Sequence, residues 1–171
     1  IAFLGPVDTY RRAAHGQTVR LVVPEAGRLR SSPDAILSSV LAASDALRVG
    51  DRDRTVQLFA APTGQVQWGV RGLQTGDTDA WVRDREQVAD ADNIWLHEYV
   101  HTRQSFTLAR ETRWLTEATA SYYAALLSYD QDLIGFGAFR DRLALGTNSP
   151  AAESVLADPG RWAGAAPYTK G

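Results

Sequence analysis

Apolar and polar residues alternate along much of the first half of the chain, which is the pattern of half-buried β-strands. The segments 8–14 and 17–24 flank a His-Gly pair and predict a hairpin. The segments 55–62 and 65–72 are joined by Pro-Thr-Gly and predict a second hairpin. A short apolar stretch at 79–82 predicts one more strand.

Helical spacing, with apolar residues three or four positions apart, occurs once in the first half and dominates the second. It predicts helices at 33–49, 93–107 and 112–130, and weaker ones at 135–145 and 150–157. Ser-Pro-Asp begins the first of them in the usual way, with serine as the cap.

Strands followed by helices indicate an α+β fold, and 171 residues correspond to about one domain. We expect a single compact domain over 1–171, with a β-rich part at 1–88 that contains a mixed sheet and a helical part at 89–171. Because the sequence begins with Ile1 rather than methionine, we expect it to be a fragment of a longer protein.

The composition of the chain excludes several classes of partner and of catalytic chemistry. A net charge of −2 provides no basic field, so we expect no nucleic-acid partner. No apolar stretch approaches the roughly 20 residues that cross a bilayer, which predicts no membrane-spanning segment. The absence of cysteine from the sequence excludes disulfides, thiolate zinc ligands and a cysteine nucleophile. Only three histidines occur, His15, His97 and His101.

Two of these histidines belong to one motif, because residues 97–101 read His-Glu-Tyr-Val-His, an HExxH sequence. Residues four apart on a helix point about 40° apart, so both imidazoles can bind one metal ion, and Glu98 lies beside that ion. Zinc suits two imidazoles and a carboxylate with one position open for water, whose proton a neighbouring carboxylate can take. The alternative is a pair of helix-surface histidines on either side of an acid.

A metal ion held by two histidines needs a further ligand, and the next predicted helix offers Glu117. Glu117 lies among the apolar residues that run from Trp114 to Ala120, where a lone buried carboxylate is unfavourable without a partner. The alternative for Glu117 is an acid of the first helical turn, stabilised by the helix dipole.

HExxH followed by Trp-Leu-x-Glu-x-x-Ala-x-Tyr at 114–122 resembles the gluzincin zinc metallopeptidases, most closely the aminopeptidase N and leukotriene hydrolase branch and more distantly thermolysin. The resemblance implies a zincin-like fold, with a helical half that carries the HExxH helix and the third-ligand helix. It also implies one Zn2+ bound by His97, His101 and Glu117, and Glu98 as the general base. The C-terminal Pro-Tyr-Thr-Lys-Gly resembles the P-Y-x-K-G segment of that branch, which implies that the Tyr168 hydroxyl donates to the oxyanion.

The chain also departs from that branch. Aminopeptidases of the branch carry a G-x-M-E-N segment whose glutamate holds the free amine of the substrate. Here the corresponding residues 71–75 read Arg-Gly-Leu-Gln-Thr, so we expect Gly72 and Gln74 to line the substrate site. A neutral amide holds an ammonium group less well than a carboxylate does, which argues against aminopeptidase specificity. Ser121 stands where thermolysin relatives have an aspartate that orients a histidine.

The sequence therefore predicts a zinc metallopeptidase that acts on a peptide or protein substrate, by a metal-activated water with Glu98 as base. The alternative from another class is a non-catalytic peptide-binding or scaffold domain that keeps the zincin fold. The pattern leaves open the cleavage specificity, the oligomeric state and the compartment, including membership of a larger secreted or membrane-anchored protein.

Overall fold

The computed structural model describes residues 5–47, 54–64, 69–104, 109, 112 and 114–145. This part of the chain forms a mixed α+β fold of five strands and four helices, in agreement with the predicted fold class. In chain order these are β1 (Val7–Ala14), β2 (Gln17–Pro24), α1 (Pro33–Ala46), β3 (Thr55–Ala61), β4 (Gly72–Gln74), β5 (Asp79–Arg83), α2 (Ile94–His101), α3 (Trp114–Asp130) and α4 (Phe136–Ala144).

The strands form one mixed sheet in the order β1-β2-β3-β5-β4. The three central strands are parallel, and the two edge strands β1 and β4 run antiparallel to their neighbours. The predicted first hairpin is confirmed, since β1 and β2 are joined by His15 at φ 50° and Gly16 at φ 80°. Two successive residues with positive φ give a turn whose twist matches that of the strands.

The predicted second hairpin is wrong. β3 pairs with β2 on one side, where Thr18 aligns with Thr55, and with β5 on the other, where Gln57 aligns with Asp79. No free side of β3 is left for the segment that follows it, and β4 pairs with β5 instead. Alternation of apolar and polar residues predicts a strand but not the strand that pairs with it. Here the chain crosses from β2 through α1 to β3, so β3 pairs in parallel with β2. Residues 65–68 lie outside the described part.

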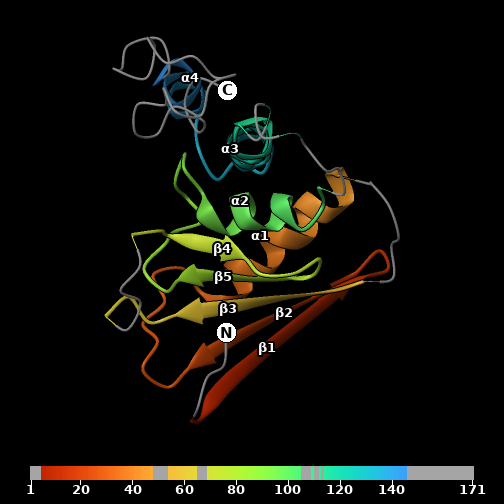
Figure 1. The fold of residues 1–171 in the computed structure, drawn as a ribbon, viewed down its shortest axis with the longest axis vertical. Coiled ribbons are helices and arrows are strands. Elements are labelled where there is room, and N and C mark those ends of the chain that lie inside the picture. Colours follow the sequence, from red (N-terminus) through yellow and green to blue (C-terminus); the bar gives the residue numbers. More distant parts are fainter. Residues whose placement is uncertain are drawn as a thin grey trace.

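The helices stand in layers on one side of the sheet (Figure 1). α1 and α2 cover the sheet, α3 packs against α2, and α4 packs against α3. The core lies between the sheet and the first helical layer and holds fully buried side chains such as Leu21, Leu58, Ile36, Trp95 and Leu96. This arrangement places α2 between the sheet and α3.

Most of the predicted helix ends agree with the structure. Ser32 caps α1 by accepting a hydrogen bond from the Ala35 N–H at 3.2 Å, and α3 and α4 lie within their predicted ranges. The helix predicted at 93–107 is wrong at residues 102–104, because α2 ends at His101 and Thr102 and Arg103 form a turn; residues 105–107 lie outside the described part. The helix predicted at 150–157 lies outside the described residues.

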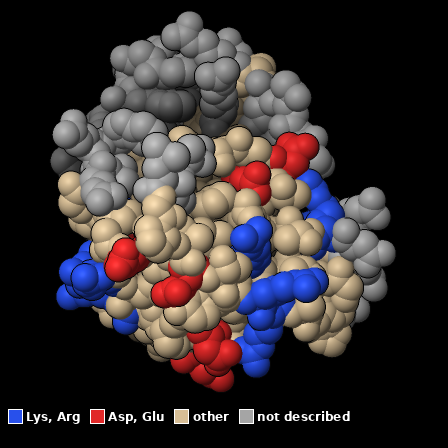
Figure 2. Space-filling view, turned by 90° about the horizontal axis from the view of Figure 1, so that it is seen from below, with Lys and Arg blue, Asp and Glu red and all other residues tan. Residues whose placement is uncertain are grey.

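On the face seen from below in Figure 2, basic and acidic side chains are intermingled. Arg12 and Asp34 form an ion pair of 2.8 Å between β1 and α1. Among the described helices, none is long and apolar enough to cross a membrane.

Candidate metal centre

The HExxH sequence lies on α2, so its two histidines are one helical turn apart, as predicted. The Nε2 atoms of His97 and His101 are 3.1 Å apart, and their side chains are 7% and 10% exposed. Two imidazoles that converge in this way, with little access to water, need either a shared proton or a shared cation.

Glu117 in the first turn of α3 completes this cluster. Its Oε2 atom lies 3.2 Å from Nε2 of His97 and 3.4 Å from Nε2 of His101. The three donor atoms therefore form a nearly equilateral triangle. Four ligands placed tetrahedrally around zinc at 2.0–2.1 Å stand about 3.3 Å from one another. The triangle thus has the edge length of such a site, and the donor set of two imidazoles and a carboxylate fits the same ion.

Neighbouring side chains hold the two imidazoles. Nδ1 of His101 lies 2.9 Å from Oε1 of Gln104, and Nε2 of Gln104 donates to the Thr116 carbonyl at 3.0 Å. One amide therefore connects His101 on α2 to the backbone that precedes Glu117 on α3. Nδ1 of His97 faces the Ser121 hydroxyl at 3.5 Å, which is at the limit for a hydrogen bond. Hydrogen bonds to the second ring nitrogen orient metal-binding histidines.

Sequence reasoning missed the role of Gln104. It sits three residues after the motif, in a stretch predicted as helix, and no spacing rule assigns it a partner. Only the turn after His101 returns its amide to α3, so no signal in the sequence could have found it.

Glu98 is not one of the three donors of the triangle, and its carboxylate lies against the edge strand β4. It is 5% exposed, and the backbone N–H of Gln74 forms a hydrogen bond with its carboxylate. Gly72 lies against the same carboxylate, so closely that a Cβ added there would stand 2.6 Å from Oε1 of Glu98. Gly72 and Gln74 align with Val82 and Ala80, core residues of the helix-covered face, so both β4 residues lie on the Glu98 side.

The electrostatics separate the two acids. Burial raises the pKa of Glu98 to about 7, with a further contribution from the charge of Glu117. Burial acts in the same direction on Glu117, but hydrogen bonds with His101 and His97 outweigh it and hold the pKa of Glu117 at about 2. Burial lowers the pKa of His97, whereas for His101 the contact with Glu117 outweighs burial and raises the pKa.

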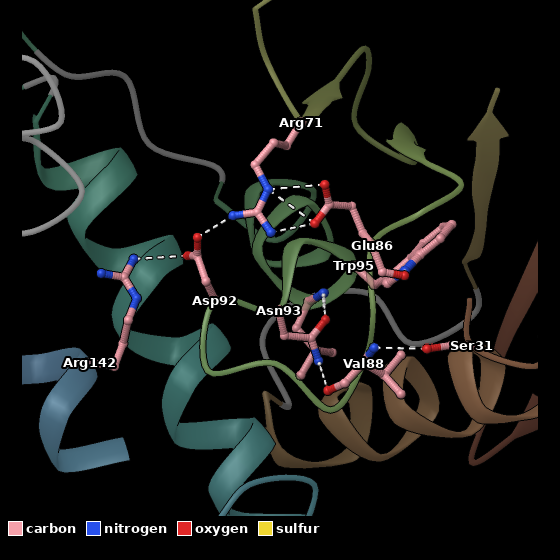
Figure 3. Close-up of polar contacts among 9 residues, drawn as sticks. Ser31, Arg71, Glu86, Val88, Asp92, Asn93, Trp95 and Arg142 are labelled. Carbon is pink, nitrogen blue, oxygen red and sulfur yellow. Dashed lines mark hydrogen bonds and ion pairs between the residues drawn. The ribbon is translucent and has the colours of Figure 1, made fainter. Parts of the chain in front are cut away.

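The start of α2 is fixed by a buried cap. Asn93 is fully buried, and its Oδ1 accepts a hydrogen bond from the Leu96 N–H at 3.2 Å. Its Nδ2 donates to the Val88 carbonyl at 2.9 Å and to the Ser128 hydroxyl of α3 at 3.1 Å. This side chain anchors α2 both to the preceding loop (Figure 3) and to the helix that carries Glu117.

The structure thus brings together five of the residues that the sequence singles out: His97, His101, Glu117, Glu98 and Gly72, with Gln74 adjacent through its backbone. The side-chain amide of Gln74 turns back and donates to the Gly76 carbonyl. Tyr168, the predicted oxyanion donor, lies outside the described residues.

The fold and site together define an α+β domain in which two helices present a three-donor cluster beside an edge strand. The crystal structure of an aminopeptidase N family protein from Idiomarina loihiensis is similar in fold, with a TM-score of 0.61 and 16% sequence identity. The similarity covers 96% of this chain and 34% of that chain, so this chain spans about a third of the length of its structural neighbour. No protein-family model and no curated protein matches the sequence.

Proposed function

We propose that this chain is the catalytic core of a zinc-dependent peptidase of the gluzincin type. The observation that carries the proposal is the triangle of donor atoms from His97, His101 and Glu117, with separations of 3.1, 3.2 and 3.4 Å. A structural neighbour from the aminopeptidase N family supports the proposal at the level of the fold.

In this proposal His97, His101 and Glu117 hold one zinc ion. Zinc, when bound, supplies a Lewis acid that polarises a carbonyl and lowers the pKa of water. Its open coordination position is compatible with the 32% exposure of the Glu117 side chain, because solvent reaches this side of the cluster.

Glu98 is the proposed general base. It is adjacent in sequence to His97 but its carboxylate is directed at β4, so it remains outside the donor triangle. From there it can accept a proton from water as that water attacks a peptide carbonyl, and later return the proton to the leaving amine.

For substrate recognition we propose that Gly72 and Gln74 line the site from β4. An extended peptide can lie along this edge strand and pair with its backbone. The resemblance places neutral Gln74 where an acid would hold the free amine of an aminopeptidase substrate. We therefore expect N-acetylated peptides to be cleaved at least as well as the same peptides with a free amine.

Tyr168 is the proposed donor to the oxyanion, on the strength of the Pro-Tyr-Thr-Lys-Gly resemblance alone. Replacement of Tyr168 by Phe should lower kcat by about 10²-fold and leave the zinc content unchanged.

A second candidate is a peptide-binding scaffold without turnover. Two departures favour it: Gln74 is neutral where aminopeptidases of the resembling branch carry an acid, and Ser121, 3.5 Å from His97, stands where thermolysin relatives have an aspartate. The buried acid Glu98 weighs against it, since a binding domain needs no base in that place.

Metal analysis followed by a quenched-peptide library separates the two candidates. The peptidase predicts one zinc per chain and cleavage that a chelator abolishes and added zinc restores. Zinc without cleavage of any peptide would favour the scaffold, and the absence of bound zinc after reconstitution would overturn the zinc peptidase.

A further inference from the structure

Gly72 and Glu98 approach each other more closely than any other residue type at position 72 would permit. The position of an added Cβ lies 2.6 Å from Oε1, 2.7 Å from Cγ and 2.9 Å from Cδ of Glu98. Carbon and its neighbours prefer separations of about 3.5 Å or more, so a methyl group would push the carboxylate away by about 1 Å. The atoms that must move are the end of one side chain, so the sheet itself can keep its position.

The residue that precedes Gly72, Arg71, connects β4 to the loop before α2. Nε of Arg71 donates to both carboxylate oxygens of Glu86 at 3.0 Å, and another nitrogen of its guanidinium group binds Asp92. Both acids belong to the loop that leads into α2, as Figure 3 shows. The Arg71 carbonyl also accepts the N–H of Arg83 in β5 at 2.9 Å.

The acids bound by Arg71 are themselves attached to the helices. The Glu86 carbonyl accepts a hydrogen bond at 3.0 Å from the indole N–H of Trp95, a fully buried residue in the first turn of α2. Asp92 also pairs with Arg142 of α4 at 3.0 Å, and the Arg142 side chain is only 9% exposed. A three-residue strand at the edge of the sheet is thereby connected to the helix that carries Glu98.

We propose that Gly72 and Arg71 are positioning residues for Glu98: Gly72 leaves the space that its carboxylate fills, and Arg71 holds β4 against α2 at that distance. The inference rests on the proposed function, because the position of Glu98 matters for activity only if Glu98 is the base. Neither residue supplies a donor to the triangle of His97, His101 and Glu117, so both act on proton transfer and not on metal binding.

The first test is Gly72→Ala, with Gly69→Ala as the matched control because a Cβ at Gly69 meets no described atom within 4 Å. A base displaced by about 1 Å should lower kcat about 100-fold with zinc content unchanged. Gly69→Ala should retain the parental kcat. Parental kcat in Gly72→Ala, or zinc lost in parallel with activity, would overturn the proposal.

The second test replaces Arg71. Arg71→Gln removes the contacts to both acids and should lower kcat about tenfold at constant zinc content. Arg71→Lys keeps the positive charge but not the bidentate geometry, so its kcat should lie between those of Arg71→Gln and the parent. An Arg71→Gln protein with parental kcat would remove Arg71 from the proposal.

A readout without turnover keeps this inference separate from the proposed function. The amide proton of Gln74, which contacts the Glu98 carboxylate, can be followed by NMR in the parent, Gly72→Ala and Glu98→Gln proteins. We expect its resonance to shift in both variants and to stay in place in Gly69→Ala. A parent protein that cleaves no peptide would contradict the proposed function. A Gln74 amide resonance that does not shift in Gly72→Ala would contradict the positioning role of Gly72.

Discussion

The helix pair α2 and α3 and the edge strand β4 meet at the same place in the molecule but are held there differently. On the helices, His97 and His101 are one turn apart on one face, and Glu117 is brought to them by direct packing of α3 on α2. β4 is three residues long, pairs with β5, and has no second strand partner in the described part of the chain.

The difference indicates that the helices determine metal binding, whereas β4 determines the position of Glu98. The donor triangle depends on helix geometry and on helix–helix contacts, which are local and repeat at fixed spacing. The environment of Glu98 depends on residues 24 or more positions earlier in the chain, through Gly72 and the Gln74 N–H. Metal binding should therefore tolerate changes in β4, whereas proton transfer should not.

The largest effect is expected from Glu98→Gln. Glutamine fills nearly the same volume against Gly72 but cannot accept the proton of water, so kcat should fall by about 10³-fold. Zinc content should equal that of the parent, because Glu98 lies outside the triangle. Stopped assays with a cleaved peptide and metal analysis of the same samples measure both quantities, and peptide cleavage at the parental rate would rule out Glu98 as the base.

Glu117→Ala tests the helix side of the comparison. Loss of one of three protein ligands should weaken zinc binding on the order of 100-fold, given the roughly 3 kcal/mol that each ligand contributes to a tightly bound ion. Competition with a coloured chelator gives the affinity. Glu98→Gln is the matched control, since it alters an acid next to the cluster without removing a donor; equal affinities in the two variants would contradict the assignment of Glu117.

Gln104→Ala should have a smaller effect on the same quantity. The variant leaves all three donors in place but removes the amide that orients His101 and holds the Thr116 carbonyl. Zinc affinity should fall by about tenfold. Ser121→Ala should lower zinc affinity by less than Gln104→Ala, because the Ser121 hydroxyl is 3.5 Å from Nδ1 of His97. A larger loss of zinc affinity in Ser121→Ala than in Gln104→Ala would show that the His97 contact is the stronger one.

Asn93→Ala tests how firmly α2 is anchored. The change removes a helix cap and leaves the buried Val88 carbonyl and Ser128 hydroxyl without this partner, which should lower the free energy of unfolding by about 2 kcal/mol. Ser32→Ala, which removes an exposed cap with a single bond at α1, should lower it by about 1 kcal/mol. Urea unfolding of the zinc-free proteins avoids the added stability that a bound metal confers; equal losses would show that the buried contacts of Asn93 add nothing.

The same comparison explains which features could be predicted from the sequence. The strands β1, β2, β3 and β5, the cap at Ser32, and the helical motif that pairs His97 with His101 follow from spacing and local propensity, and the structure agrees with each of these elements. Local signals act over a few residues, so they identify elements even when the fold is unknown.

Features that depend on contacts between distant segments could not be predicted in this way. Alternation of apolar and polar residues predicted β3 as a strand. The predicted pairing of β3 with residues 65–72 was wrong, because β3 lies between β2 and β5 in the sheet. The space that Glu98 occupies beside Gly72, and the amide of Gln104 between α2 and α3, exist only after the chain has folded. The proposed placement of Glu98 and the orientation of His101 therefore depend on long-range contacts that could not be predicted from the sequence.

Anomalous diffraction at the zinc edge from crystals of the zinc-reconstituted protein tests the central claim most directly. We predict a single strong peak within about 2.0–2.2 Å of Nε2 of His97, Nε2 of His101 and a carboxylate oxygen of Glu117, with Glu98 outside bonding distance. A peak that Glu117 does not reach, or that Glu98 ligates, would contradict the account.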